Sequence, residues 1–176
     1  MAIRKFKGIY PNIDKTAYID ESCTIIGDVK IGEYSSVWPQ SVVRGDVHQV
    51  TIGKRTNIQD GSILHVTSDN VFTPGGFPLV IGDNVTIGHG AILHACTIEN
   101  NCLIGIGSII LDGAIIKSGA MIAAGSLVGP NKVVESGILY KGSPAKPSRE
   151  LTRKEIKYIE FSSNHYVKTM LEHIKK

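Results

Sequence analysis

The sequence predicts a mainly β protein in which short parallel strands coil into a stack, followed by one C-terminal α-helix. Three observations predict it. An aliphatic residue recurs every six positions over most of the chain, and a small or β-branched residue follows most of these anchors by four. After about residue 148 the apolar residues change to the spacing of an amphipathic helix. We therefore expect a repeat domain at residues 1–147 and, at residues 148–176, a helix that packs along it.

The six-residue repeat begins at Ile13 and continues to Val134. This period is too long for one helical turn and suits a short strand followed by a tight turn. Three repeats would make one triangular turn with the anchors inside, and successive turns would pair as parallel strands. The anchors are Ile13, Ile19, Ile25, Ile31, Val37, Val43, Ile52, Ile58, Leu64, Ile81, Ile87, Leu93, Ile98, Ile104, Ile110, Ile116, Ile122, Val128 and Val134.

Two insertions and the C-terminal segment depart from this repeat. Three extra residues precede Ile52, and residues 66–80 separate Leu64 from Ile81. The longer insertion contains two prolines and a Gly-Gly pair, which favours a protruding loop. Helical spacing in the C-terminal segment is carried by Leu151, Ile156, Ile159, Tyr166, Met170 and Ile174.

Composition and charge narrow the classes of function. The net charge is +3, and the basic residues are dispersed outside the C-terminal tail, so we expect no nucleic-acid partner. No apolar run approaches the roughly 18 residues of a membrane span, and residues 1–8 lack the apolar core of a signal peptide. We therefore expect no membrane partner and a cytoplasmic location. The three cysteines lack paired spacing, which argues against a disulfide framework or a thiolate metal site.

Two histidines follow anchors that stack on one face of the predicted coil. His65 comes directly after Leu64, and His94 directly after Leu93. Because these anchors belong to successive turns, the two imidazoles should lie about one strand spacing apart, in the same outer column as Arg44. Two imidazoles so placed can bind one metal ion.

A third histidine occupies a different face. His89 lies two residues after the anchor Ile87, so it should point away from His65 and His94 around a corner of the prism. A neighbouring copy could bring its own His89 to the pair, which predicts a homotrimer with shared metal sites. Three neutral imidazoles leave a fourth tetrahedral position for water, whose pKa the metal lowers to about 7.

Four short motifs surround these histidines. They are Val43-Arg44-Gly45-Asp46, Asn57-Ile58-Gln59-Asp60-Gly61, Leu64-His65, and Gly88-His89 followed by Leu93-His94. Together they resemble the γ-class carbonic anhydrase family, and the repeat from Ile13 to about Tyr140 resembles hexapeptide-repeat proteins with a left-handed parallel β-helix. This resemblance implies that CO2 and water are converted to bicarbonate and a proton through a metal-bound hydroxide at trimer interfaces.

The resemblance also implies a role for each site residue. His65 and His94 of one subunit and His89 of its neighbour would hold the metal, which would be Zn²⁺, with Fe²⁺ or Co²⁺ as alternatives because imidazole suits all three. Gln59 would orient the bound water or the substrate. An interface network would be formed by Arg44, Asp46 and Asp60. Tyr166, on the C-terminal helix, would match a tyrosine that the family carries near the site.

Two positions differ from the most active members of that family. Val47 stands where those members carry a glutamate, and the loop at 66–80 offers only Asp69 in place of a proton-shuttling glutamate. Loss of a shuttle slows each turnover without removing the metal site. A weakly active or inactive metal-binding homologue, acting on another substrate or as an assembly protein, is therefore an alternative. An acyl-CoA-dependent transferase on the same fold is a second, but it would need only one histidine as a base.

Overall fold

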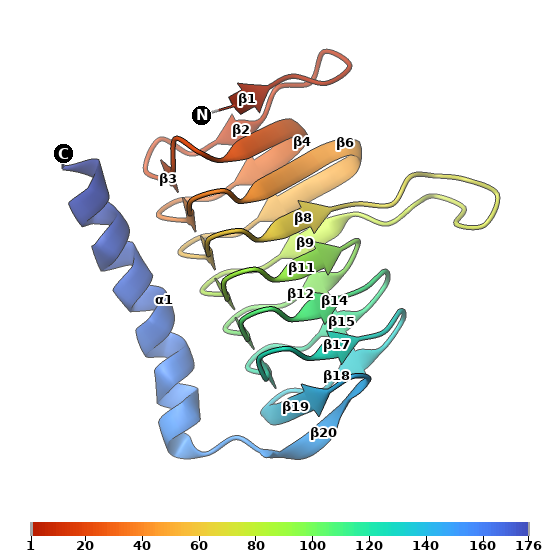
Figure 1. Ribbon diagram of the computed structural model, residues 1–176, viewed down its shortest axis with the longest axis vertical. Coiled ribbons are helices and arrows are strands. Elements are labelled where there is room, and N and C mark those ends of the chain that lie inside the picture. Colours follow the sequence, from red (N-terminus) through yellow and green to blue (C-terminus); the bar gives the residue numbers. More distant parts are fainter. Residues whose placement is uncertain (1, 176) are drawn as a thin grey trace.

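A computed structural model describes residues 2–175, so Met1 and Lys176, the ends of the predicted ranges, lie outside the described residues. Parallel turns form a stack, and one helix runs alongside it (Figure 1). The prediction of a mainly β, parallel coil of hexapeptide repeats with a C-terminal helix is confirmed.

Most of the strands are short because each spans one side of a turn; β4 and β6 are the exceptions. They are β1 (Ala2–Arg4), β2 (Asn12–Ile13), β3 (Tyr18–Ile19), β4 (Thr24–Ile31), β5 (Ser36–Val37), β6 (Val42–Ile52), β7 (Asn57–Ile58), β8 (Ile63–His65), β9 (Leu79–Ile81), β10 (Thr86–Ile87), β11 (Ile92–His94), β12 (Thr97–Ile98), β13 (Leu103–Ile104), β14 (Ile109–Ile110), β15 (Ile115–Ile116), β16 (Met121–Ile122), β17 (Leu127–Val128), β18 (Val133–Val134), β19 (Ile138–Gly142) and β20 (Ala145–Glu150). The helix is α1 (Arg153–Ile174).

The strand register follows the repeat. Leu64 pairs with Val43 on one side and with Leu93 on the other, while Ile58 pairs with Ile87 on the next face. All of these pairings are parallel, and the paired anchors are fully buried. The aliphatic interior therefore fixes which residues share an outer column, and so it positions the histidines.

β4 and β6 are longer than the other strands and each runs along two faces. β6 pairs with β8 near its start and with β9 near its end, and its pairing with β4 shifts register after Gly27. A Cβ atom at Gly27 would lie 2.3 Å from the carbonyl oxygen of Gly45, and the residue has φ +77°. Only glycine allows the two backbones to approach this closely. This widened corner carries Asp46.

α1 begins at a capping box and packs along one sheet. Thr152 Oγ1 accepts a hydrogen bond from the Glu155 backbone N–H (3.2 Å), and the Glu155 carboxylate accepts one from the Thr152 backbone N–H (2.8 Å). The helix contacts β3, β5, β7 and β10, and Tyr166 meets Trp38 edge to face at 5.4 Å between ring centroids. Among residues 2–175 no helix has the length and apolar character needed to cross a membrane.

Two segments leave the stack. Residues 66–78 form a loop that projects from the side opposite α1 (Figure 1), so the loop predicted at 66–80 is two residues shorter because Leu79 and Val80 belong to β9. At the C-terminal end, β20 turns back and pairs antiparallel with β19. Residues 148–150, which lie within the range predicted to hold the helix, thus continue a strand, and α1 begins at Arg153.

Candidate metal centre

His65 and His94 face one another on adjacent turns. The parallel register of β8 and β11 pairs them directly, and His65 Nδ1 lies 3.1 Å from His94 Nε2. Two nitrogens that bind one tetrahedral ion at 2.0 to 2.1 Å are separated by roughly 3.3 Å. The spacing of the two imidazoles therefore suits two ligands of one metal ion.

A carboxylate holds the other ring nitrogen of each of these histidines. His65 Nε2 lies 3.0 Å from Asp46 Oδ1, and His94 Nδ1 lies 2.9 Å from Asp112 Oδ2. An ionised carboxylate only accepts hydrogen bonds, so the ring nitrogens at these contacts carry the protons. The two facing nitrogens then both present lone pairs, which repel unless a cation lies between them. These residues fit a metal ion, and the carboxylates are the outer partners that metal-binding histidines usually have.

The electrostatics of the cluster favour a neutral His65 imidazole and charged Asp46 and Asp112 carboxylates. Burial lowers the pKa of His65, an effect that the hydrogen bond to Asp46 opposes only in part. Burial alone would raise the pKa of Asp46, but hydrogen bonds from Arg44 and His65 outweigh it and lower that pKa. Asp112 behaves in the same way, with hydrogen bonds from Thr67 and His94 overcoming the effect of burial on its pKa. Neutral imidazole is the form that binds a metal.

His89 lies around the corner from this pair. It sits in the turn between β10 and β11, half exposed, and its Nδ1 lies 2.9 Å from Asp60 Oδ2. Within residues 2–175 of one chain, no three histidine, cysteine or acidic side chains converge as a metal site. One chain thus presents two histidines on one face and the third on another.

A groove of about 540 Å³ opens beside His89, between α1 and the sheet that contains β7 and β10. Gln59 and Tyr166 line it together with His89. The Gln59 side chain is buried and its Nε2 donates to Asn57 Oδ1 (3.0 Å), which fixes the amide at the inner end of the groove. Burial, followed by the negative charge of Asp60, raises the pKa of Tyr166, so its hydroxyl stays protonated.

The residues implied by the resemblance therefore fall into two groups. The first group contains Arg44, Asp46 and His65. Within it, Arg44 Nη1 and Asp46 Oδ2 form an ion pair at 2.5 Å. The second group contains Gln59, Asp60, His89 and Tyr166. Within one chain Arg44 does not pair with Asp60; each has another partner.

Asp112 is the site residue that the sequence analysis missed. It follows the anchor Ile110 by two residues, and Ile109–Ile110 pair with Ile92–Leu93 one turn earlier. Extending the stacked column one turn beyond His94 reaches Leu111, and Asp112 is its neighbour, so a carboxylate close to His94 could have been anticipated. A second unforeseen feature is a buried polar chain in which Asn57 Nδ2 donates to Thr86 Oγ1 (3.0 Å) and Thr86 Oγ1 lies 3.0 Å from Ser162 Oγ of α1.

Comparison with known proteins relates the chain to hexapeptide transferase family proteins and to carbonic anhydrases. The model of the bacterial transferase hexapeptide family (six repeats) matches residues 95–130. Protein YrdA of Escherichia coli is 51% identical over 98% of this chain and 94% of its own length. A carbonic anhydrase of Geobacillus kaustophilus is 48% identical over 94% of this chain and 87% of its own length. The crystal structure of a hexapeptide transferase family protein from Anaplasma phagocytophilum superposes with a TM-score of 0.90, at 43% identity over 97% of both chains.

Proposed function

Because the chain belongs to the γ-class carbonic anhydrase-like family of hexapeptide-repeat proteins, we propose that it is a metal-dependent carbonic anhydrase. It would convert CO2 and water to bicarbonate and a proton at sites shared between the subunits of a homotrimer. Relatives named as carbonic anhydrases imply a metal cofactor. The observation that carries the proposal is the 3.1 Å approach of His65 Nδ1 and His94 Nε2, each imidazole having its other nitrogen on a carboxylate.

The division of the histidines between two faces supports a shared site. His89 has its Nδ1 on Asp60 and its Nε2 free to meet the His65 and His94 pair of a second copy. Ile63 and Ile92 lie exposed directly before Leu64 and Leu93, in a column beside the histidine pair. Ile106 is exposed one turn from His89, whose carbonyl oxygen accepts a hydrogen bond from Gly107 N. Exposed apolar side chains beside both half-sites are what an interface between copies would cover.

Each residue of this chain then has a defined task. Asp46 and Asp112 hold the imidazoles of His65 and His94 in the required tautomer, and Asp60 does so for His89. The Gln59 amide and the protonated Tyr166 hydroxyl can donate hydrogen bonds to the substrate from the groove. When bound, Zn²⁺, which we propose as the metal with Fe²⁺ or Co²⁺ as alternatives, supplies Lewis acidity that makes a hydroxide nucleophile available at neutral pH.

Removal of the product proton is the step that we expect to limit turnover. Asp69 Oδ1 accepts a hydrogen bond from Gly75 N (2.8 Å), so this carboxylate helps to hold the loop in shape. Val47 offers no acceptor beside Asp46. The proton must therefore pass to solvent or buffer, and we expect turnover to rise with buffer concentration. Asp69 and Val47 therefore favour slow rather than fast hydration, and they are the observation behind the alternative, a weakly active or inactive metal-binding homologue.

A decisive experiment measures CO2 hydration by stopped flow, with metal content and native mass determined on the same sample. We expect a trimer with about one metal ion per subunit and hydration that is lost on chelation and restored by Zn²⁺, Fe²⁺ or Co²⁺. The variant His89→Ala should lose both metal and hydration while the coil stays folded, and His48→Ala should lose neither. Full metal retention in His89→Ala would exclude this ligand set. A metal-loaded trimer without hydration would support the inactive metal-binding homologue, which acts on another substrate or as an assembly protein.

A further inference from the structure

The tip of the loop between β8 and β9 carries two apolar side chains that are almost fully exposed to solvent. Val71 is 87% exposed and Phe72 is 93% exposed. The tip around them is nonetheless held in a fixed shape. Asn70 Oδ1 accepts hydrogen bonds from the backbone N–H groups of Phe72 (2.9 Å) and Thr73 (3.1 Å). An ordered tip that presents two apolar side chains to water is typical of a surface made for contact.

The groove beside His89 offers a matching apolar surface. Tyr158 and Phe161 of α1 line its outer part and are 54% and 59% exposed. Ile106, which is also exposed, lies on the opposite wall. The groove is therefore unfilled and aromatic where it opens to solvent.

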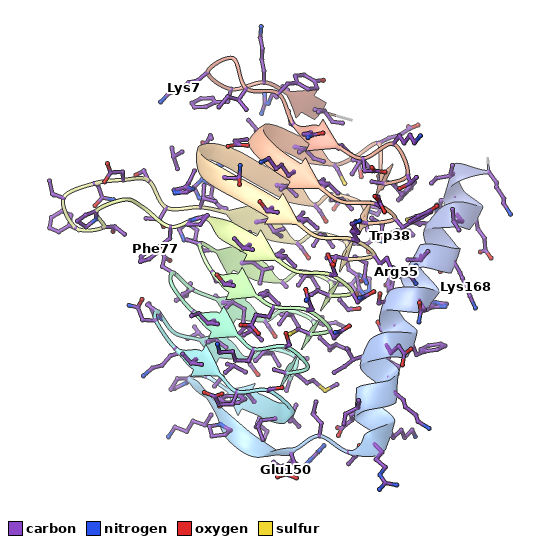
Figure 2. All side chains as sticks on the ribbon, turned by 180° about the vertical axis from the view of Figure 1, so that it is seen from behind. Lys7, Trp38, Arg55, Phe77, Glu150 and Lys168 are labelled. Atoms are coloured by element: carbon purple, nitrogen blue, oxygen red, sulfur yellow. The ribbon has the colours of Figure 1, made fainter. Side chains whose placement is uncertain are left out.

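The loop cannot enter the groove of its own chain. Figure 1 shows the loop projecting from one side of the stack and α1 running along the other. In the reverse view, Phe77, at the base of the loop, lies across the stack from Lys168 of α1 (Figure 2). Any contact between the tip and the groove must therefore join two copies of the chain.

The proposed metal site places these two features beside each other in neighbouring subunits. The loop begins at Val66, one residue after His65, and His89 lines the groove. If His65 of one copy and His89 of the next bind one ion at about 2.0 to 2.1 Å, the base of the loop and the groove lie side by side. Five extended residues, 67–71, reach about 17 Å at roughly 3.3 Å per residue, enough to carry the tip along the groove.

We propose that Val71 and Phe72 of each subunit dock into the groove between α1 and the β-sheet of the neighbouring subunit, closing the outer side of the shared metal site. This inference rests on the proposed function, because it needs the metal-sharing arrangement of the subunits. The occupant of the groove is a second copy of this chain.

Cross-linking between introduced cysteines tests the contact. The double variant Phe72→Cys, Phe161→Cys places one thiol on the tip and one in the groove, and the matched control Phe72→Cys, Glu160→Cys moves the second thiol to the other flank of α1, which lines a different pocket. The native cysteines Cys23, Cys96 and Cys102 are all buried and should not compete. With a short bis-maleimide, we expect covalent dimers and trimers from the first variant and few or none from the control.

The outcomes separate this inference from the proposed function. A metal-loaded trimer in which the first variant fails to cross-link, or links no better than the control, would overturn the docking and leave the proposed function intact. A monomer without metal would overturn both. An independent measurement compares Phe72→Asp with Phe72→Leu. We expect the charged variant to raise the dissociation constant of the trimer at least about tenfold and the apolar variant to change it little, and equal values for the two would also contradict the docking.

Discussion

The turns formed by residues 24–96 and those formed by residues 97–134 both bury an aliphatic anchor in each repeat. They differ in their insertions, strand lengths and polar side chains. The first set contains both insertions, the long strands β4 and β6, and all three candidate metal ligands. It also buries Asn57, Gln59 and Thr86. In the second set every strand has two residues, and the buried polar side chains among its described residues are two serines, Ser108 and Ser126.

This difference separates what makes the fold from what makes the site. The hexapeptide family model matches residues 95–130, which lie almost wholly in the regular set. Regular repeats are recognisable because every position has one structural task. The irregular turns use the same kind of aliphatic anchor, and they carry the three histidines, the insertions and the buried amides of the candidate site. Three substitutions test this separation.

Removing an anchor from the regular set should have the largest effect on stability. Ile116 is fully buried and pairs with Ile98 and Val134, so Ile116→Ala leaves a cavity and should lower the free energy of unfolding by about 2–5 kcal/mol. Denaturant unfolding measures this loss, with exposed Lys132→Ala as the control that should change it little. Metal bound per folded subunit should not change, and a loss of metal in the folded protein would break the separation.

Asp112 sharpens the comparison, because it belongs to the regular set and yet contacts His94. Asp112→Asn keeps the shape of the side chain but weakens the hydrogen bond that fixes the His94 tautomer. We expect metal affinity to fall about 10–100-fold, with little change in unfolding, when measured by competition with a chelator. Glu135→Gln, an exposed substitution in the same set, serves as the control. Unchanged affinity in Asp112→Asn would confine the site to the irregular turns.

The smallest effect on stability should come from a substitution at the start of α1. This helix lies outside both sets of turns and packs against the irregular set. Hydrogen bonds from Arg149 and Thr152 lower the pKa of Glu155 below its usual 4.5. Since the unfolded state takes up this proton first, the stabilisation is complete above pH 4.5 and declines as the pH falls toward the lowered pKa. Glu155→Gln should therefore lower the melting temperature slightly at pH 7 and by less below pH 4.5. A difference that stays constant with pH would rule out the charge of Glu155 as its cause.

The sequence was sufficient for the fold and for part of the site. The six-residue repeat fixed which anchors stack, and so it predicted that His65 and His94 lie together and that His89 points elsewhere. The contact between Asp112 and His94 was missed because a lone carboxylate in a regular repeat looks like a surface residue. The chain from Asn57 through Thr86 to Ser162 was not predictable either, since it depends on how α1 docks. β20 was not predicted because an antiparallel return strand has no six-residue period.

The antiparallel strand β20 also bears on how the molecule avoids forming fibres. A stack of parallel strands ends in open edges, and such an edge can template the addition of another chain. β20 covers the end of the sheet at β19 and runs in the opposite direction to the repeats. Its Pro147 lacks an N–H group, and Lys146, Arg149 and Glu150 place charges along its outer edge. Addition of another chain at this edge of the 8-stranded sheet is thereby discouraged.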